Sequence, residues 1–384
     1  MKLWKGFSTM QIPGIELRIC ETMGWLALDD TDSLDGGCTT YTFDQILREL
    51  NQLSATGSPW SISSDERLVR LWPFAARRTR GNASVSARMI VHESGEDIFL
   101  KTLGLLFEKY VQKPTNSVPT SHHSNRTQYP ASPVLIWFKK KPSEINYWRA
   151  VSSEVDLNSV IIDLEKDQNA IIWSHGELHG AIGAQAAASW NGTELCTWEL
   201  TAYRSRSMFG LPRIVPQIIV EEMDSKFEKT FLNRDPTKEK SFIAPRSNCP
   251  VLYGIRSRDS LSSESAHLWM QSRDGIEKSS HYRIWRTNQA TDDHLTGKWR
   301  GHVISPPAVL EKGHASVVIE GRFIPDSMNF VDEIESDRRI TIVAFAQGGF
   351  VNSLLRDMHV GDEIECMGLI SPNGEVHAEK IRII

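Results

Sequence analysis

The chain has 384 residues, of which 40% are hydrophobic and 24% charged, and its formal net charge is −5. This composition is typical of a globular protein, and the length predicts two or three domains. No apolar run approaches the length of a membrane span, and no signal peptide is recognisable at the N-terminus. We therefore expect no membrane association and a cytoplasmic location. The five cysteines are widely spaced and never form a Cys-x-x-Cys pair, which argues against a disulfide framework and a zinc ribbon.

Strands and helices are predicted in alternation up to about residue 298. Residues 1–22 carry no clear periodicity and are interpreted as a leader or extension. In chain order we expect a strand at 25–28, a helix at 43–52, a loop at 54–66, strands at 67–72 and 83–90, a helix at 94–112, a loop at 113–133, a strand at 134–138, a helix at 143–153, a strand at 171–173, a helix at 181–189, a strand at 197–204, a charged connection at 221–248, a strand at 250–256, a helix at 259–270 and a strand at 282–286.

The last 80 or so residues have a different pattern. Short alternating strands are predicted near 301–305, 314–323, 339–346, 363–370 and 375–383, with one helix at 350–356. Five strands with a helix between the third and the fourth predict an OB-fold, a small barrel that commonly binds single-stranded nucleic acid. Another small β-barrel is the alternative.

An acidic motif follows the first predicted strand. Residues 29–41 read Asp-Asp-Thr-Asp-Ser-Leu-Asp-Gly-Gly-Cys-Thr-Thr-Tyr, with four carboxylates and five hydroxyls in thirteen positions. Mg²⁺ prefers oxygen ligands, and the pair Gly36-Gly37 allows backbone N–H groups to face a phosphate. The helix behind the motif would place that phosphate at its N-terminus. We interpret the motif as a Mg²⁺ and nucleotide-phosphate site; an acidic turn that only caps the helix is the alternative.

Three further stretches carry polar residues in loops. Residues 77–82 place arginines beside a glycine, which suits phosphate contact, although an exposed basic turn explains them equally well. Residues 174–183 form a glycine-spaced loop before a helix, which predicts either an anion cradle or close helix packing. The segment Asp292-Asp293-His294 is a candidate to bind a cation, to serve as acid and base, or to hold a basic substrate. A turn that caps a helix is the alternative for this segment.

Together these stretches resemble one family, the archaeal tRNA agmatinylcytidine synthetases. The matching segments, in the family's order, are Leu28–Ser33 with Gly37–Tyr41, Thr79–Asn82, Ile182–Ala184, Glu199–Arg204, Cys249–Arg256 and Asn288–His294. The resemblance extends from Met23 to Ile384, and the combination of segments is specific where each segment alone is not.

The resemblance implies an α/β (α+β) multidomain fold. It predicts a kinase-like ATP-binding domain over residues 23–200, a ferredoxin-like domain over 201–298 and an OB-fold domain over 299–384, with interleaving of the first two as an alternative. It also implies that ATP is used to phosphorylate C2 of the wobble cytidine in the minor isoleucine tRNA, which has a CAU anticodon. Agmatine then displaces the phosphate, which enables decoding of AUA. The expected cofactors are ATP and Mg²⁺, and the expected partners are tRNA and agmatine.

The resemblance also assigns roles to residues of this chain. Asp29, Asp30 and Asp32 are the predicted Mg²⁺ ligands, and Thr39 is the hydroxyl that is phosphorylated or handles phosphate. Asp30, Asp32 and Thr39 form the predicted catalytic set. The predicted nucleotide contacts are Asp29, Gly36, Gly37, Arg80, Gly81 and Asn82. Asp292, Asp293 and His294 are candidates for binding the cationic ends of agmatine.

Two features depart from the family pattern. The sequence ends at Ile384 with the predicted barrel and contains no cysteine pair, so we expect no zinc ribbon and no zinc site; another surface or a separate protein would hold the tRNA acceptor end. His179 stands where the family more often has Arg or Lys. Two competing hypotheses remain: a non-catalytic OB-fold RNA-binding protein, and an ATP-dependent kinase or ligase that acts on another RNA or on a small molecule.

Overall fold

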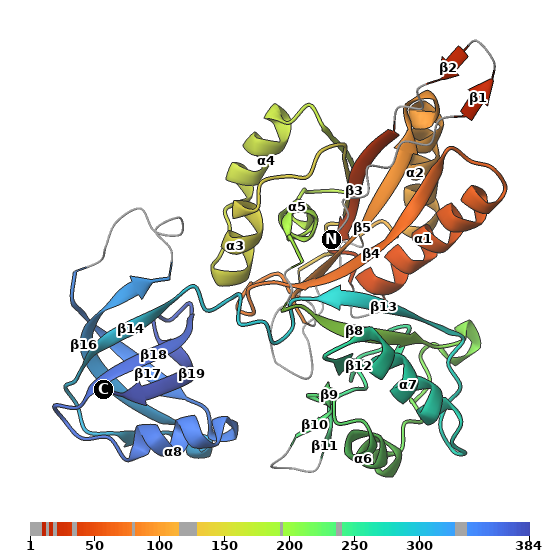
Figure 1. The fold of residues 1–384 in the computed structure, drawn as a ribbon. Coiled ribbons are helices and arrows are strands. Elements are labelled where there is room, and N and C mark those ends of the chain that lie inside the picture. The colour runs from red at the N-terminus through yellow and green to blue at the C-terminus, as the bar shows by residue number, and fades with distance from the viewer. Residues whose placement is uncertain are drawn as a thin grey trace.

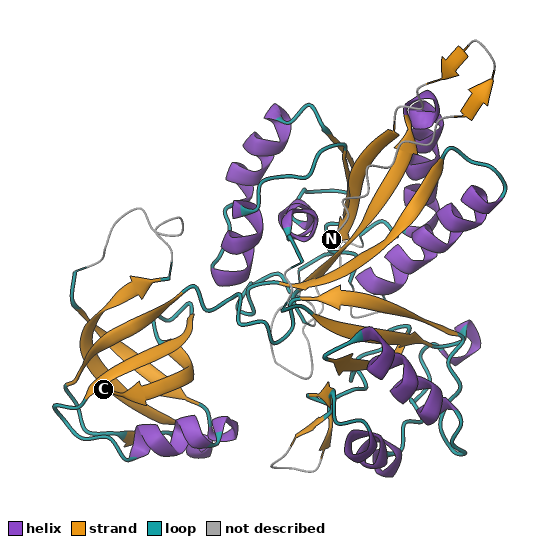
Figure 2. Ribbon diagram, in the orientation of Figure 1, coloured by secondary structure: helices purple, strands orange, loops and turns teal. Residues whose placement is uncertain are grey.

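A computed structural model describes residues 10–12, 15–17, 21–32, 37–78, 81–114, 129–192, 195–235, 240–326 and 336–384. The protein is a mixed α/β structure with two main sheets, one of nine strands and one of six (Figures 1 and 2). Two short two-stranded ladders complete it, one formed by β1 (Met10–Ile12) and β2 (Ile15–Leu17), the other by β10 (Arg234–Asp235) and β11 (Lys240–Ser241).

The strands of the nine-stranded sheet all come from the chain before the last 90 or so residues. In spatial order its strands are β7 (Ala170–Ser174), β6 (Val134–Phe138), β3 (Glu21–Asp29), β5 (Ala83–His92), β4 (Trp60–Arg70), β13 (His281–Thr287), β8 (Thr197–Tyr203), β12 (Val251–Ser257) and β9 (Thr230–Phe231). Neighbouring strands are antiparallel except β4 and β13, which are parallel and pair Arg67 with Arg286 and Leu68 with Thr287. The two halves of the sheet therefore meet along one short parallel contact.

Helices cover the sheet on both faces. α1 (Thr39–Ala55) and α2 (Glu96–Tyr110) pack on one face of the first half, while α4 (Leu157–Lys166) and α5 (Gly180–Ser189) pack on the other, with α3 (Ile145–Ser152) beside α5. α6 (Gln217–Lys226) and α7 (Ser260–Gln271) pack against β8 and β12 in the second half.

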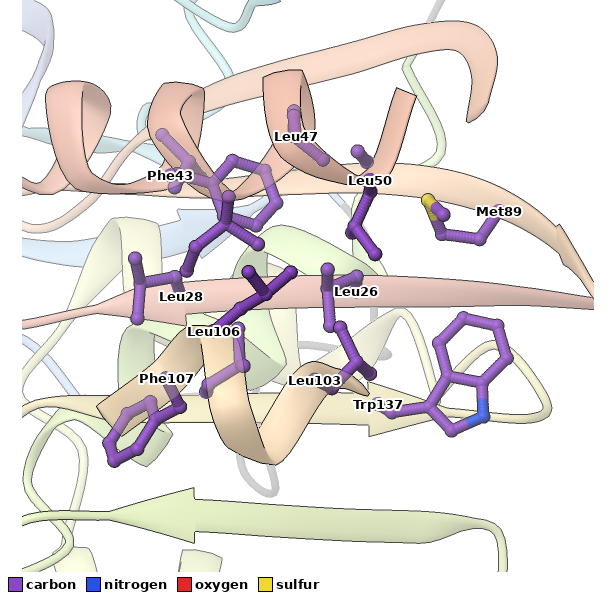
Figure 3. Packing of buried hydrophobic residues seen from close by; sticks show 14 of the residues in the cluster. Leu26, Leu28, Phe43, Leu47, Leu50, Met89, Leu103, Leu106, Phe107 and Trp137 are labelled. Carbon is purple, nitrogen blue, oxygen red and sulfur yellow. The ribbon is translucent and has the colours of Figure 1, made fainter. Parts of the chain in front are cut away.

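The alternation of side chains along β3 explains the two-sided packing. Leu26 and Leu28 are fully buried beneath α1 and α2, where side chains of both helices converge on them (Figure 3). Trp25 and Ala27 face the opposite way and pack against α4 and α5. Because successive strand residues point to opposite faces, a continuous apolar run is what a strand covered on both sides requires.

The second sheet closes on itself. Its strands are β14 (Gly297–Val303), β15 (Ala308–Val309), β16 (Ala315–Pro325), β17 (Arg338–Ala344), β18 (Glu363–Ile370) and β19 (Val376–Ile383), in the order β14-β18-β19-β17-β16-β15. β14 also pairs with β16, which closes a five-stranded ring, and α8 (Phe350–Arg356) lies between β17 and β18 in the chain. Alternate residues of these strands, among them Trp299 and Ile319, fill the core of the ring.

Most predicted elements are confirmed, with shifts of a few residues at their ends. The predicted loop at 54–66 is wrong, because β4 begins at Trp60 and pairs with β5 from Trp60 onward. The connection predicted at 221–248 contains much of α6 as well as β9, β10 and β11, and α4 was not predicted. In the part of the chain that the structure describes, no helix combines the length and apolarity needed to cross a membrane.

Candidate functional site

A pocket of about 600 Å³ opens where β3 ends. The acidic motif forms one wall, and the segment after β4 forms another with Leu71, Trp72 and Arg77. The α3–α4 loop and the start of α5 complete it. Six of the predicted site residues line this pocket, namely Asp29, Asp30, Asp32, Thr39, Gly81 and Asn82. The fold thus brings the two predicted phosphate-binding stretches to one cavity.

Asp29 and Asp30 are buried carboxylates of the pocket whose pKa values are both raised. Burial raises the pKa of Asp30 to about 7, although the Ser132 N–H, 3.0 Å from Asp30 Oδ2, and the charge of Arg77 both act to lower it. Burial, together with the charge of Asp30, raises the pKa of Asp29 well above its ordinary value. Among the described residues, no Lys or Arg forms an ion pair with either carboxylate. Both groups therefore need a cation, or a proton, to lie where they do.

The donor set suits a divalent cation that is shared with a ligand. Mg²⁺ is typically bound by one or two carboxylates together with phosphate oxygens and water. Within the described ranges, no group of three His, Cys, Asp or Glu side chains could hold a metal ion by itself. Asp29 and Asp30 supply the oxygens that Mg²⁺ prefers, and phosphate oxygens would have to complete its coordination.

Asp32 has a different local role from its two neighbours. Its Oδ1 accepts hydrogen bonds from the backbone N–H of Thr39 at 2.7 Å and from the Thr39 hydroxyl at 3.1 Å. Because Thr39 is the first residue of α1, Asp32 satisfies one of the open N–H groups at that helix end. Thr31 also contacts the Thr39 hydroxyl through its own hydroxyl, at 3.3 Å. The capping alternative thus describes Asp32, and the same contact fixes the orientation of the Thr39 hydroxyl in the pocket.

The glycines of the 174–183 stretch allow α5 to approach β3. A methyl group added to Gly183 would lie 1.8 Å from Asp29 Oδ2, and one added to Gly180 would lie 2.7 Å from the carbonyl oxygen of Ser132. These distances favour the packing interpretation of the two glycines over an anion cradle. His179, directly before α5, lines the pocket and pairs with Glu177 at 3.0 Å. Burial and the charge of Arg77 lower the pKa of His179.

Asn82 supports the wall that it forms. Its side-chain amide donates to the carbonyl oxygen of Trp72 at 2.8 Å, and its backbone carbonyl accepts from Leu71 N at 2.9 Å. Gly37 precedes α1 but does not line the pocket. Gly36 and Arg80 lie outside the described residues, so their predicted roles remain predictions.

The segment 292–294 lies elsewhere and does not line the pocket. Asp293 Oδ2 accepts a hydrogen bond of 2.5 Å from the Tyr147 hydroxyl on α3. The other two residues contact β19 of the barrel: Asp292 pairs with Lys380 at 2.5 Å, and His294 with Glu379 at 2.8 Å. In this structure the segment connects the large sheet to the barrel, and its predicted contact with agmatine remains untested.

Sequence reasoning missed the wall formed by residues 153–157. These residues join α3 to α4 and face the acidic motif across the pocket. The available signal was the N-terminal pattern of α4, in which Asp156 Oδ2 accepts from Ser159 N at 3.0 Å. Recognition of that helix start would have predicted a polar loop before residue 157. It would not have predicted that this loop lines the pocket.

Comparison with known proteins gives a consistent result. The sequence matches the family models of the TiaS TCKD domain over residues 25–173 and of the TiaS FLD domain over residues 179–294. The isoleucine-tRNA 2-agmatinylcytidine synthetase TiaS of Methanopyrus kandleri is 31% identical, with 94% of this chain and 80% of the relative covered. The TiaS of Methanocaldococcus jannaschii is 29% identical, with 94% and 82% covered.

A solved structure shows the same fold. The crystal structure of a TiaS complex with its isoleucine tRNA and ATP aligns with a TM-score of 0.75 at 24% identity, covering 94% of this chain and 81% of that one. The two family models together span well over half of the chain, and the acidic motif that they include lines the pocket. This chain belongs to the TiaS family, the 2-agmatinylcytidine synthetases of the minor isoleucine tRNA.

Proposed function

We propose that this chain is an ATP-dependent ligase that forms 2-agmatinylcytidine at the wobble cytidine of the minor isoleucine tRNA. Family membership supports this function, as do the names of the relatives and the complex of a structural neighbour with its isoleucine tRNA and ATP. The observation that carries the proposal most directly is the meeting of Asp29, Asp30 and Thr39 in one pocket. The proposed location is the cytoplasm.

The reaction explains why such a pocket is needed. The oxygen on C2 of cytosine leaves poorly, so its replacement by an amine requires that it first be phosphorylated. In phosphoryl transfer, most of the protein's contribution is positioning and neutralisation of charge. When bound, Mg²⁺ would neutralise the phosphates of ATP. Asp29 and Asp30 are the residues that would hold the ion, because they are oxygen donors that form no ion pair with a described Lys or Arg side chain.

The remaining pocket residues orient the reactants. Asp32 holds the Thr39 hydroxyl, which is the proposed phosphate-handling group. Arg77, with Arg80 and Asn82, is proposed to contact phosphate or the target base. The wobble base must leave the stack to reach C2, which is easiest in the single-stranded anticodon loop.

The finer fold assignment is also proposed. We assign residues 23–200 to a kinase-like domain, 201–298 to a ferredoxin-like domain and 299–384 to an OB-fold. The closed ring β14-β16-β17-β19-β18, with α8 between its third and fourth strands in the chain, supports the OB assignment. The shared sheet supports interleaving of the first two domains, since β8 begins before residue 200 and lies beside β13.

The test combines a labelled substrate with one substitution. Purified protein is incubated with ATP, Mg²⁺, labelled agmatine and the minor isoleucine tRNA, and nucleosides are then analysed. We expect label in a modified cytidine, no turnover in Asp30→Ala, and nearly unchanged tRNA binding in that variant. Asp163→Ala, which removes an exposed carboxylate on α4, is the matched control and should keep full activity.

Other outcomes assign the protein differently. ATP consumption that requires tRNA but transfers no label would indicate another amine donor. tRNA binding without any ATP turnover would favour the non-catalytic RNA-binding protein. Equal loss of turnover and tRNA binding in Asp30→Ala would contradict the catalytic role of that carboxylate.

A further inference from the structure

A second cleft lies on the same face of the sheet as α1, outside the pocket described above. It has a volume of about 280 Å³ and is bounded by α1, by the end of α2, and by the residues next to the ends of β8 and β13. Its lining is almost entirely polar and includes Tyr41, Gln45, Arg48, Tyr110, Arg206 and His281. The α1 residues recur at helical spacing, so they form one stripe along the cleft.

Two arginines give this cleft its positive charge. Arg48 on α1 and Arg206 after β8 are both exposed. Among the described residues, neither forms an ion pair with a carboxylate. Arg206 donates a hydrogen bond of 3.4 Å to Gln45 Oε1 and another to the side chain of Tyr41, and both of these partners are neutral. Two guanidiniums in a polar cleft are suited to bind an anion.

The carboxylates near the cleft are already neutralised. Glu49, which itself lines the cleft, accepts from Lys109 Nζ at 2.7 Å. The almost fully buried Asp44 pairs with Arg283 at 2.6 Å and with His281 at 2.8 Å. Arg204, which also borders the cleft, is compensated by Glu277 at 2.6 Å. The uncompensated charge is therefore that of Arg48 and Arg206, and it opposes a dication such as agmatine.

An aromatic side chain lies beside these charges. The ring of Tyr41 packs against Tyr203 at 5.4 Å and against Phe209 at 5.7 Å, which fixes its position at the edge of the cleft. Proteins bind single-stranded nucleic acids with this combination of a fixed aromatic ring and guanidinium groups, because bases stack on the ring while phosphates pair with the cations.

Helix α1 connects the cleft to the pocket. Thr39 lines the pocket and Tyr41 lines the cleft, two residues further along the same helix. At about 1.5 Å of rise and about 100° of rotation per residue, the two positions lie about 3 Å apart along the helix axis but project to roughly opposite sides of the helix. An RNA strand with one base in the pocket would therefore pass around the first turn of α1 to bring its adjoining backbone to the cleft.

We propose that this cleft binds the RNA backbone next to the modified base. Arg48 and Arg206 contact phosphate, and Tyr41 offers a stacking surface for a neighbouring base. The inference rests on the proposed function, since it requires an RNA substrate. It adds a second contact region to that function, and this region determines affinity for RNA without contacting the reacting atoms.

The test measures binding of a hairpin RNA with the CAU anticodon loop, by fluorescence anisotropy at several salt concentrations. In the double variant Arg48→Ala/Arg206→Ala we expect about tenfold weaker binding for each guanidinium removed. The slope of log K against log salt should fall by about 1 for each lost phosphate contact. Arg48→Lys/Arg206→Lys should retain most of the affinity. Arg273→Ala, which removes an exposed arginine paired with Glu222, is the matched control.

Each outcome decides the inference. Unchanged RNA affinity and salt slope in the double alanine variant, with a wild-type protein that binds RNA, would overturn it and leave the proposed function standing. Weaker ATP binding with unchanged RNA binding would assign the cleft to the nucleotide instead. A wild-type protein that binds no RNA would remove both the proposed function and this inference.

Discussion

Replacement of Asp30 by asparagine would show how much the negative charge of Asp30 lowers the free energy of unfolding, separately from the role of this residue in turnover. Asparagine keeps an oxygen to accept the hydrogen bond from Ser132 N, and it tolerates the positive φ of 56° at this position. Burial raises the pKa of Asp30 from its ordinary 3.8 to about 7. Because one pKa unit corresponds to about 1.4 kcal/mol, the ionised carboxylate destabilises the folded apo protein by about 4 kcal/mol at most. Water that reaches the pocket reduces this, so we expect about 2–4 kcal/mol.

The sign follows from proton binding. Between pH 3.8 and about 7 the folded state holds the Asp30 proton more tightly than the unfolded state does. The stability of the wild-type protein should therefore fall as pH rises through this window, by the contribution of this group. The asparagine side chain carries no charge, so the stability gained in Asp30→Asn should be close to zero near pH 4, and largest above pH 7.

Urea denaturation of the apo protein across this pH range measures the effect. The same variant should lose turnover, and Mg²⁺ with ATP should stabilise it less than the wild-type protein, because ligands stabilise only the state that binds them. Asp163→Asn, which changes an exposed carboxylate on α4, is the control and should change stability by less than about 0.5 kcal/mol. A gain that does not depend on pH, or a loss of stability at alkaline pH, would refute the assignment of an uncompensated charge to Asp30.

Two further substitutions test contacts of the helices α5 and α3. Gly183→Ala places a methyl group 1.8 Å from Asp29 Oδ2, so we expect a loss of about 1–3 kcal/mol in thermal denaturation and weaker ATP binding; an unchanged melting temperature would show that α5 can move away. Tyr147→Phe removes the 2.5 Å hydrogen bond to Asp293 and the acceptor of a 3.0 Å bond from Asn288, and should cost about 1–3 kcal/mol in urea denaturation. Tyr282→Phe, which removes the hydrogen bond of that hydroxyl to Glu264, is its control, and equal effects of the two would contradict the importance of the Tyr147 hydroxyl.

Local patterns in the sequence explain why part of the site was predictable. The apolar run before Asp29 defines a strand, and the motif after it must lie at the end of that strand. The start of α1 then brings Thr39 back to Asp32 over seven positions, a contact between near neighbours in the chain. The strands of the second sheet were predictable for the same reason, because apolar and polar residues alternate within each of them.

Long-range contacts account for what was missed. Residues 54–66 contain the Ser, Gly, Pro and Asp that usually mark a loop, yet β5 supplies a partner for them from Trp60 onward. The register of the β4–β5 pairing shifts between Ile62 and Glu66, so the polar residues between them do not interrupt the strand. The pairing of β4 with β13 and the contacts of segment 292–294 with the barrel depend on residues far apart in the chain, which no local pattern records.

The place of Trp285 in the fold has a consequence for synthesis of the chain. This residue of β13 is fully buried in the core of β3, β5, α1 and α2, where it stacks on Phe43 at 6.4 Å. While the ribosome makes the residues between β4 and β13, β4 remains an open edge of the sheet. During this time the core around Phe43 lacks Trp285. Open edges invite pairing with other chains, so the nascent protein passes through an aggregation-prone stage that ends only when β13 emerges. A fragment cut near residue 200 would remain at that stage permanently.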